Sequence, residues 1–127
     1  MAPFFPFRGF QVCSMNYKIK ALPDFVRTLK RLSKKYHSIK QDYAKLLEEL
    51  YANPQAGIDL GGGLRKVRMA IASKGRGKSH GARVITFTVV VAIEESEINL
   101  LTIYDKAERE SISQKEIEAL LKEADLL

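Results

Sequence analysis

Cationic side chains gather between Leu64 and Ile93, and they are of the types that bind phosphodiesters and catalyse their cleavage. The segment contains no aspartate or glutamate. Its basic residues are Arg65, Lys66, Arg68, Lys74, Arg76, Lys78 and Arg83. Two strand-like runs flank a glycine-rich loop, so this charge would lie on a hairpin. Such unpaired positive charge favours a polyanionic partner, and RNA is the leading candidate.

RNA can be cleaved by its own 2′-hydroxyl, which attacks the adjacent phosphorus and expels the 5′-oxygen. An enzyme for this reaction supplies a base, an acid and cations that stabilise the phosphorane. Lys66 and Arg68 alternate with apolar residues, so both side chains project from one face of a strand. Arg83 begins the next strand and could join them. The neighbouring cations favour the neutral amine of Lys66, which could act as the base. Alternatively, the charged side chains of these two strands are solvated and have no catalytic role.

Four more residues extend the candidate site. His80 could exchange a proton at neutral pH, although an exposed polar role in a loop is the simpler interpretation. Tyr104 could stack on a base or pack in the core. Lys106 and Arg109 could extend the cationic surface or pair with neighbouring glutamates.

Nucleotide, metal and disulfide sites are not expected. The segment ASKGRGKS, residues 72–79, is close to a P-loop, but Ala72 replaces the leading glycine and a strand follows where a helix is needed. Cys13 is the only cysteine, so no intrachain disulfide can form, and this suits a reducing cytoplasm. Both histidines lie far from Cys13 in the sequence, which argues against a metal site. We expect neither a cofactor nor a membrane segment.

The apolar patterns predict an α+β fold. Strands are expected over 16–21, 66–71, 82–93 and 98–104, with a loop over 55–63 and a turn over 94–96. Helices are expected from Pro23 and from Ser38, the second ending at Asn53, and they should pack antiparallel. Ser113 and Glu116 form a capping-box signature for a C-terminal helix. The hairpins predict an antiparallel core.

The chain of 127 residues and net charge +6 fits one domain. Residues 1–14 read MAPFFPFRGFQVCS and show no helical or strand period, so we interpret them as a flexible extension of a domain over 15–127. Pro3 and Pro6 interrupt what would otherwise be the apolar stretch of a signal peptide.

Three motifs, in this order and spacing, resemble the RelE/HigB branch of the RelE/ParE toxin superfamily. They read GGGLRKVRMAI, SKGRGKSHGARVI and INLLTIYDKAERESIS, and the resemblance runs from about residue 15 to the C-terminus. It implies a helical hairpin on a small twisted antiparallel sheet, with a C-terminal helix. It also implies a toxin of a type II toxin–antitoxin system, a metal-independent endoribonuclease that cuts mRNA on the ribosome and is neutralised by a cognate antitoxin.

The resemblance also implies roles for individual residues. Lys66, Arg68 and Arg83 match positions that hold phosphates, stabilise the transition state and supply a possible base. The loop that carries Lys74, Arg76 and Lys78 should touch mRNA or ribosomal RNA.

The chain departs from the family pattern in its C-terminal segment. Ile112 stands near the position of a tyrosine that assists proton transfer, and Ala107 replaces an arginine. Tyr104 or His80 could supply the missing group, and Arg109 could restore the charge.

Two other functions fit this sequence. One is a ParE-like toxin that binds and inhibits DNA gyrase, since one fold can serve both purposes. The other is a non-catalytic RNA-binding module, which explains the charge without an acid or a base. Whether the toxin is RelE-like or ParE-like, an acidic or amphipathic segment of the antitoxin should cover its positive face.

Overall fold

The computed structural model describes residues 16–92 and 94–126; the predicted extension over residues 1–14 lies outside the described residues. The helices are α1 (Pro23–Lys35), α2 (Ile39–Ala52) and α3 (Gln114–Glu123). The strands are β1 (Asn16–Ala21), β2 (Ile58–Gly61), β3 (Leu64–Met69), β4 (Ala82–Ala92) and β5 (Glu95–Asp105). Two 3-10 turns, η2 (Ala72–Lys74) and η3 (Lys78–His80), lie in the loop between β3 and β4.

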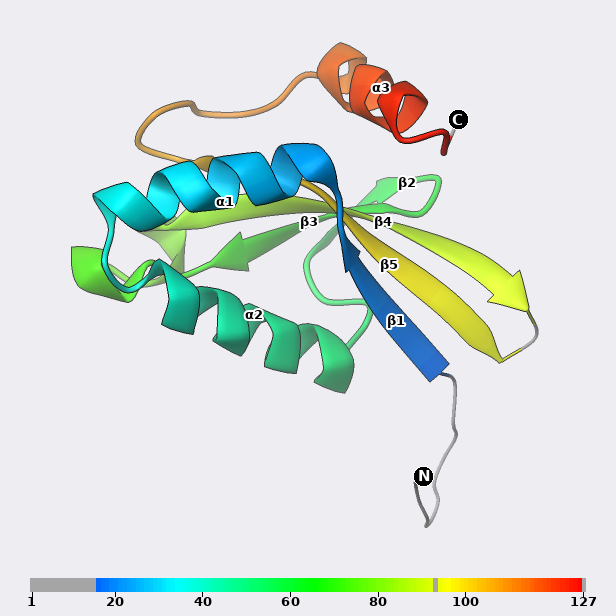
Figure 1. Ribbon diagram of the computed structural model, residues 1–127, viewed down its shortest axis with the longest axis horizontal. Helices are drawn as coiled ribbons and strands as arrows, with labels where there is room; N and C mark the ends of the chain where they lie inside the picture. The colour runs from blue at the N-terminus through cyan, green and yellow to red at the C-terminus, as the bar shows by residue number, and fades with distance from the viewer. Residues whose placement is uncertain (1–15, 93, 127) are drawn as a thin grey trace, which may run out of the picture.

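The strands form one mixed sheet in the order β1-β5-β4-β3-β2 (Figure 1). The pairs β2–β3, β3–β4 and β4–β5 are antiparallel, as the hairpin pattern predicts, whereas β1 joins β5 in parallel. The helical hairpin of α1 and α2 carries the chain from β1 at one edge to β2 at the other. The predicted α+β class, with a helical hairpin and a C-terminal helix, is confirmed.

Three strands differ from the sequence prediction: β2 is not predicted, β3 covers Leu64–Met69 rather than 66–71, and β5 begins earlier than predicted. Strand β2 lies in the stretch that the sequence predicts as loop, because its apolar–polar alternation spans only four residues, all exposed, with glycines on both sides. Strand β5 begins at Glu95 rather than at Ile98, because pairing with β4 continues to Glu95 opposite Ala92. Polar residues at the tip of a hairpin extend its backbone ladder without an apolar signal.

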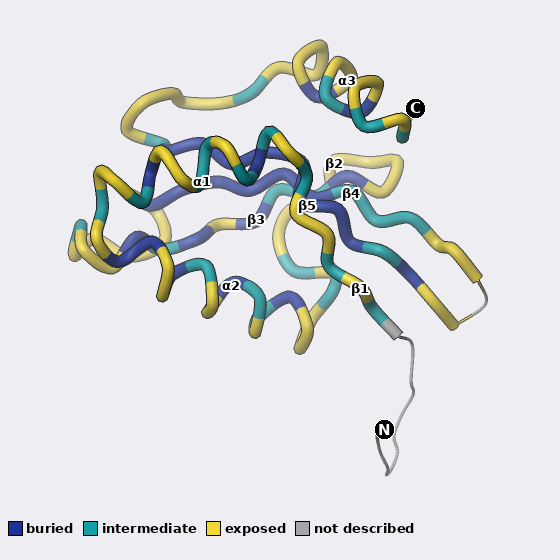
Figure 2. The backbone as a smooth tube through the Cα atoms, viewed as in Figure 1, coloured by how far each residue is buried: buried dark blue, intermediate teal, exposed yellow. Residues whose placement is uncertain are grey.

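Each face of the sheet has its own core (Figure 2). Helices α1 and α2 cover one face with Phe25, Leu32, Leu46 and other apolar residues packed on the strands. The other face carries a smaller cluster, in which α3 lies over part of the sheet. Its buried members are Leu64, Ile85, Leu101, Ile117 and Leu121.

Helix α3 begins where the capping box predicts. The Ser113 hydroxyl accepts a hydrogen bond from the backbone N–H of Glu116, whose carboxylate accepts one from the N–H of Ser113. Since the helix spans only ten residues, it covers the sheet around Leu64 and Ile85 and leaves the neighbouring rows of β3, β4 and β5 open. Three of the cationic residues predicted from the sequence, Lys66, Arg68 and Arg83, lie in those rows. Among the described residues, none of the helices is long and apolar enough to cross a membrane.

Candidate functional site

The register of three strands aligns the first candidate residues. Arg68 of β3 lies opposite Arg83 of β4, which lies opposite Tyr104 of β5. Directly paired residues share a face of a sheet, and Lys66, two positions before Arg68, shares it too. The structure therefore brings Lys66, Arg68, Arg83 and Tyr104 together on the face that α3 leaves open.

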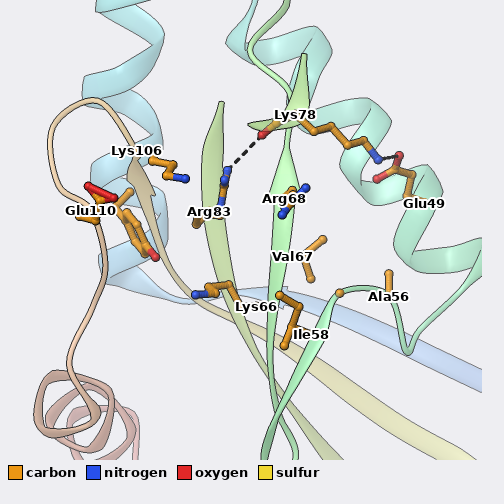
Figure 3. A pocket seen from close by; sticks show the side chains of 12 residues that line it. Glu49, Ala56, Ile58, Lys66, Val67, Arg68, Lys78, Arg83, Lys106 and Glu110 are labelled. Carbon is orange, nitrogen blue, oxygen red and sulfur yellow. Dashed lines mark hydrogen bonds and ion pairs between the residues drawn. The ribbon is translucent and has the colours of Figure 1, made fainter. Parts of the chain in front are cut away.

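These side chains line a hollow of about 400 Å³ that extends from α2 across β3 to the segment after β5 (Figure 3). Five lysines and arginines contribute to it: Lys66, Arg68, Lys78, Arg83 and Lys106. Glu49 and Glu110 also line it, and Glu49 is paired with Lys78 at 2.6 Å. Within the described part of the chain, Lys66, Arg68 and Lys106 have neither a hydrogen bond nor an ion pair from their side chains. The hollow therefore presents excess positive charge on rigid strands.

Arg83 is the most constrained of these cations, because only 5% of it is exposed. Its guanidinium donates to three backbone carbonyls, those of Lys78 at 3.0 Å, Ser79 at 3.1 Å and Ala82 at 3.2 Å. No carboxylate of the described residues forms an ion pair with it. Burial lowers the pKa of Arg83, and the nearby charge of Arg68 lowers it further. A bound anion would offset both effects.

The hydroxyl of Tyr104 is buried and has no hydrogen-bond partner among the described residues. Burial raises the pKa of this hydroxyl, against the opposing charges of Arg83 and Arg109, so it stays protonated at neutral pH. The guanidinium of Arg109 lies 5.6 Å from the centre of the Tyr104 ring. Tyr104, which lines the cationic hollow, thus keeps an unused hydrogen-bond donor.

A buried ion pair at the end of β5 holds the loop that supports Arg83. The carboxylate of Asp105 accepts hydrogen bonds from Lys74 Nζ at 2.6 Å and from the Tyr36 hydroxyl at 2.6 Å. Lys74 Nζ also donates to the carbonyl of His80 at 2.8 Å. Burial by itself would raise the pKa of Asp105, but hydrogen bonds from Lys74, Tyr36 and the N–H of Ala107 outweigh it and hold the pKa below its usual value.

A second polar contact fixes the start of the same loop on α2. The carboxylate of Asp42 accepts from the N–H of Ala72 at 3.2 Å and from the Ser38 hydroxyl at 2.7 Å. The Ser38 hydroxyl in turn accepts from the N–H of Ser73 at 2.9 Å. The loop is thus tied to α2 at one end and to β5 at the other, and its carbonyls are fixed where they receive Arg83. Sequence reasoning missed Asp42 and Asp105, because their loop partners lie about thirty residues away in the chain.

The other predicted residues are spread around this hollow. Arg65 donates to the carbonyls of Ala56 and Gly57 and lies on the opposite side of β3 from Lys66, outside the cluster. Lys74 is neutralised by Asp105. Arg109 pairs with Glu116 at 2.6 Å rather than with a neighbouring glutamate.

His80 does not line the hollow that contains Lys66, Arg68 and Arg83. It lines an adjoining one together with Arg76. Contact of these outlying residues with RNA stays a prediction.

The segment that resembles a P-loop has a different structure. Residues 72–80 form two 3-10 turns, and strand β4 follows them where a P-loop requires a helix. The strand that the sequence predicts after this segment is therefore confirmed. Among residues 16–92 and 94–126, no three histidine, cysteine or acidic side chains are grouped so that they could hold a metal ion.

The helical hairpin packed on a sheet, with a C-terminal helix, is consistent with the fold that the sequence resemblance implies, although the sheet is mixed rather than antiparallel throughout. The family described as "RelE toxin of RelE / RelB toxin-antitoxin system" matches residues 25–127 of this chain. The chain belongs to that family. It is therefore a toxin of a toxin–antitoxin system, and the family implies a cognate antitoxin as its partner.

Proposed function

We propose that this toxin is an endoribonuclease that cleaves mRNA on the ribosome in the cytoplasm. The observation that carries the proposal is the buried guanidinium of Arg83, which has no carboxylate partner among the described residues and lies in one row with Arg68 and Tyr104. Backbone carbonyls solvate this guanidinium but do not neutralise it, and a phosphodiester is an anion that would balance its charge. The family supports this reading, since RelE toxins are generally endoribonucleases.

In the proposed reaction, the 2′-oxygen attacks the adjacent phosphorus and the bond from phosphorus to the 5′-oxygen breaks. We assign Lys66 Nζ to accept the proton of the 2′-hydroxyl. Arg68 and Arg83 donate hydrogen bonds to the non-bridging oxygens as negative charge builds on the phosphorane. The products are a 2′,3′-cyclic phosphate and a 5′-hydroxyl, and no other reactant is consumed.

Tyr104 is the group we assign to protonate the departing 5′-oxygen. Tyr104 lines the same hollow as Arg83, and its buried hydroxyl has no competing partner among the described residues. His80 is the weaker candidate for the acid, since it lines the adjoining hollow and its Nδ1 lies 3.0 Å from the Ser79 hydroxyl. In this proposal, Tyr104 takes the role of the tyrosine that the family pattern has near the position of Ile112.

The test is mRNA cleavage in a translation extract, mapped by primer extension. The wild type should cut transcripts that are being translated, and Lys66→Ala and Arg68→Ala should each slow cleavage by about 100-fold, the usual effect of removing one transition-state donor or base. Lys30→Ala is the matched control, because Lys30 is an exposed lysine of α1 away from the hollow. Circular dichroism checks that each variant is folded.

Intact transcripts in an extract whose translation has stopped would refute the proposal. Two further measurements identify the alternatives. Inhibition of DNA supercoiling by purified gyrase would favour a ParE-like toxin. Binding of RNA without any cleavage product would favour a non-catalytic module.

A further inference from the structure

A second hollow, of about 620 Å³, adjoins the cationic hollow described above. It is lined by Tyr36, Lys74, Arg76, Ser79, His80 and Lys106, and no carboxylate lines it. The two hollows share Lys106, and η3 lies between them, with Lys78 lining the first and Ser79 and His80 the second. We call the second one the Arg76 hollow.

The free charge in the Arg76 hollow comes from Arg76 and Lys106. Neither side chain has a hydrogen bond or an ion pair within the described part of the chain. Lys74 contributes no net charge, because Asp105 neutralises it. His80 engages Ser79 and the carbonyl of Arg76 through Nδ1, at 3.0 and 3.3 Å, and so its Nε2 is available to a ligand.

The aromatic ring in the Arg76 hollow, that of Tyr36, already interacts with two lysines. The amines of Lys35 and Lys74 lie 5.3 and 5.1 Å from the centre of the Tyr36 ring. A base has little room to stack there, whereas the unpaired cations remain open to an anion. The hollow therefore suits a backbone phosphate, which carries charge but no sequence information.

We propose that the Arg76 hollow binds the phosphodiester next to the one held by Arg68 and Arg83, so that one RNA strand crosses both hollows. Lys106, which lines both, contacts the strand between the two phosphates. This inference rests on the proposed function, because it takes the strand in the first hollow to be RNA. An RNA backbone is favoured over an acidic peptide because the charged surface is continuous with the row that holds the scissile phosphate.

The inference is tested with short oligonucleotides that carry 2′-deoxy substitutions and so cannot be cleaved. A dinucleotide has one phosphate and a trinucleotide has two, when neither end is phosphorylated. The affinity of each for the full-length protein is measured at several salt concentrations. For the wild type, the slope of log K against log salt should be steeper for the trinucleotide by about 0.7, the value for one more phosphate contact on a single strand.

Arg76→Gln combined with His80→Gln should reduce the trinucleotide slope to that of the wild-type dinucleotide complex. A neutral methylphosphonate at one of the two trinucleotide linkages should have the same effect on the wild type. Lys30→Gln is the control and should change neither slope. Equal slopes for the two wild-type complexes, or no binding of either oligonucleotide, would overturn the inference.

Two outcomes distinguish this inference from the proposed endoribonuclease activity and from the alternative that the Arg76 hollow binds a protein. If the double variant keeps the full trinucleotide slope while Lys66→Ala still abolishes mRNA cleavage, the second subsite is refuted and the endoribonuclease stands. If the double variant binds RNA normally but loses affinity for the antitoxin, the Arg76 hollow is a protein-binding surface and the inference is wrong.

Discussion

Replacing Tyr104 by phenylalanine should stabilise this protein while it impairs cleavage. The hydroxyl of Tyr104 is buried without a partner among the described residues. A buried hydroxyl that lacks a hydrogen bond costs about 1–3 kcal/mol. Because this hydroxyl lies at the wall of a hollow, we take the lower end, and Tyr104→Phe should raise the free energy of unfolding by about 1 kcal/mol.

Urea denaturation measures this change as a higher midpoint with an unchanged m-value. The melting temperature should rise by about 4 °C for a chain of this size. In the translation extract, the same variant should cleave mRNA about 100-fold more slowly, because the proposed proton donor is gone. A gain in stability together with a loss of activity is typical of a residue kept for function.

Tyr36→Phe is the matched control, since it removes the same atom from a hydroxyl that has a partner. The Tyr36 hydroxyl donates to the carboxylate of Asp105 at 2.6 Å. Loss of a hydrogen bond to a charged group costs about 1.5–3 kcal/mol, so this variant should be destabilised. The two substitutions therefore have opposite signs. If Tyr104→Phe also lost about 1 kcal/mol with an unchanged m-value, its hydroxyl would have a partner in the folded state and the reasoning would fail.

Three further predictions concern stability. Gly81→Ala should lower the free energy of unfolding by about 2 kcal/mol, because the new Cβ would overlap the carbonyl oxygen of Met69. Urea denaturation measures this change, and an unchanged midpoint of the unfolding transition would contradict the prediction. Ser113→Ala should cost about 1 kcal/mol by the same measurement, because it removes the cap of α3, and a loss below 0.3 kcal/mol would show that the cap is dispensable. Because the pKa of Asp105 is depressed in the folded state, its ionised form contributes stability that is complete above the unfolded pKa of about 4 and is lost as the pH falls through the folded pKa. The free energy of unfolding of Asp105→Asn should therefore depend less on pH below about 4 than that of the wild type. Parallel pH profiles for the wild type and the variant would refute this.

Much of the fold could be predicted from local patterns. The alternation around Lys66 and Arg68 places both on one face, since successive side chains of a strand point to opposite sides. The start of α3 follows from Ser113 and Glu116, whose side chains bond within one turn. Strand β2 escaped prediction because its apolar–polar alternation covers only four exposed residues and is flanked by glycines.

Residues of the same type proved to have different surroundings, and the sequence could not distinguish them. Lys74 and Arg76 are two positions apart in one basic loop. Lys74 is captured by Asp105, whereas Arg76 has no partner among the described residues. The difference depends on where β5 ends relative to the loop, which no local pattern encodes.

By itself, the sequence determined the three helices, strands β1, β3, β4 and β5, and the face of β3 on which Lys66 and Arg68 lie, because the geometry of the backbone sets those periods locally. Only the tertiary structure decided that Arg83 is buried on nearby backbone carbonyls and that its row ends at Tyr104, whose buried hydroxyl has no partner among the described residues. Burial and pairing arise where segments distant in the chain come into contact. The charge that an anion would balance is therefore a property of the folded molecule.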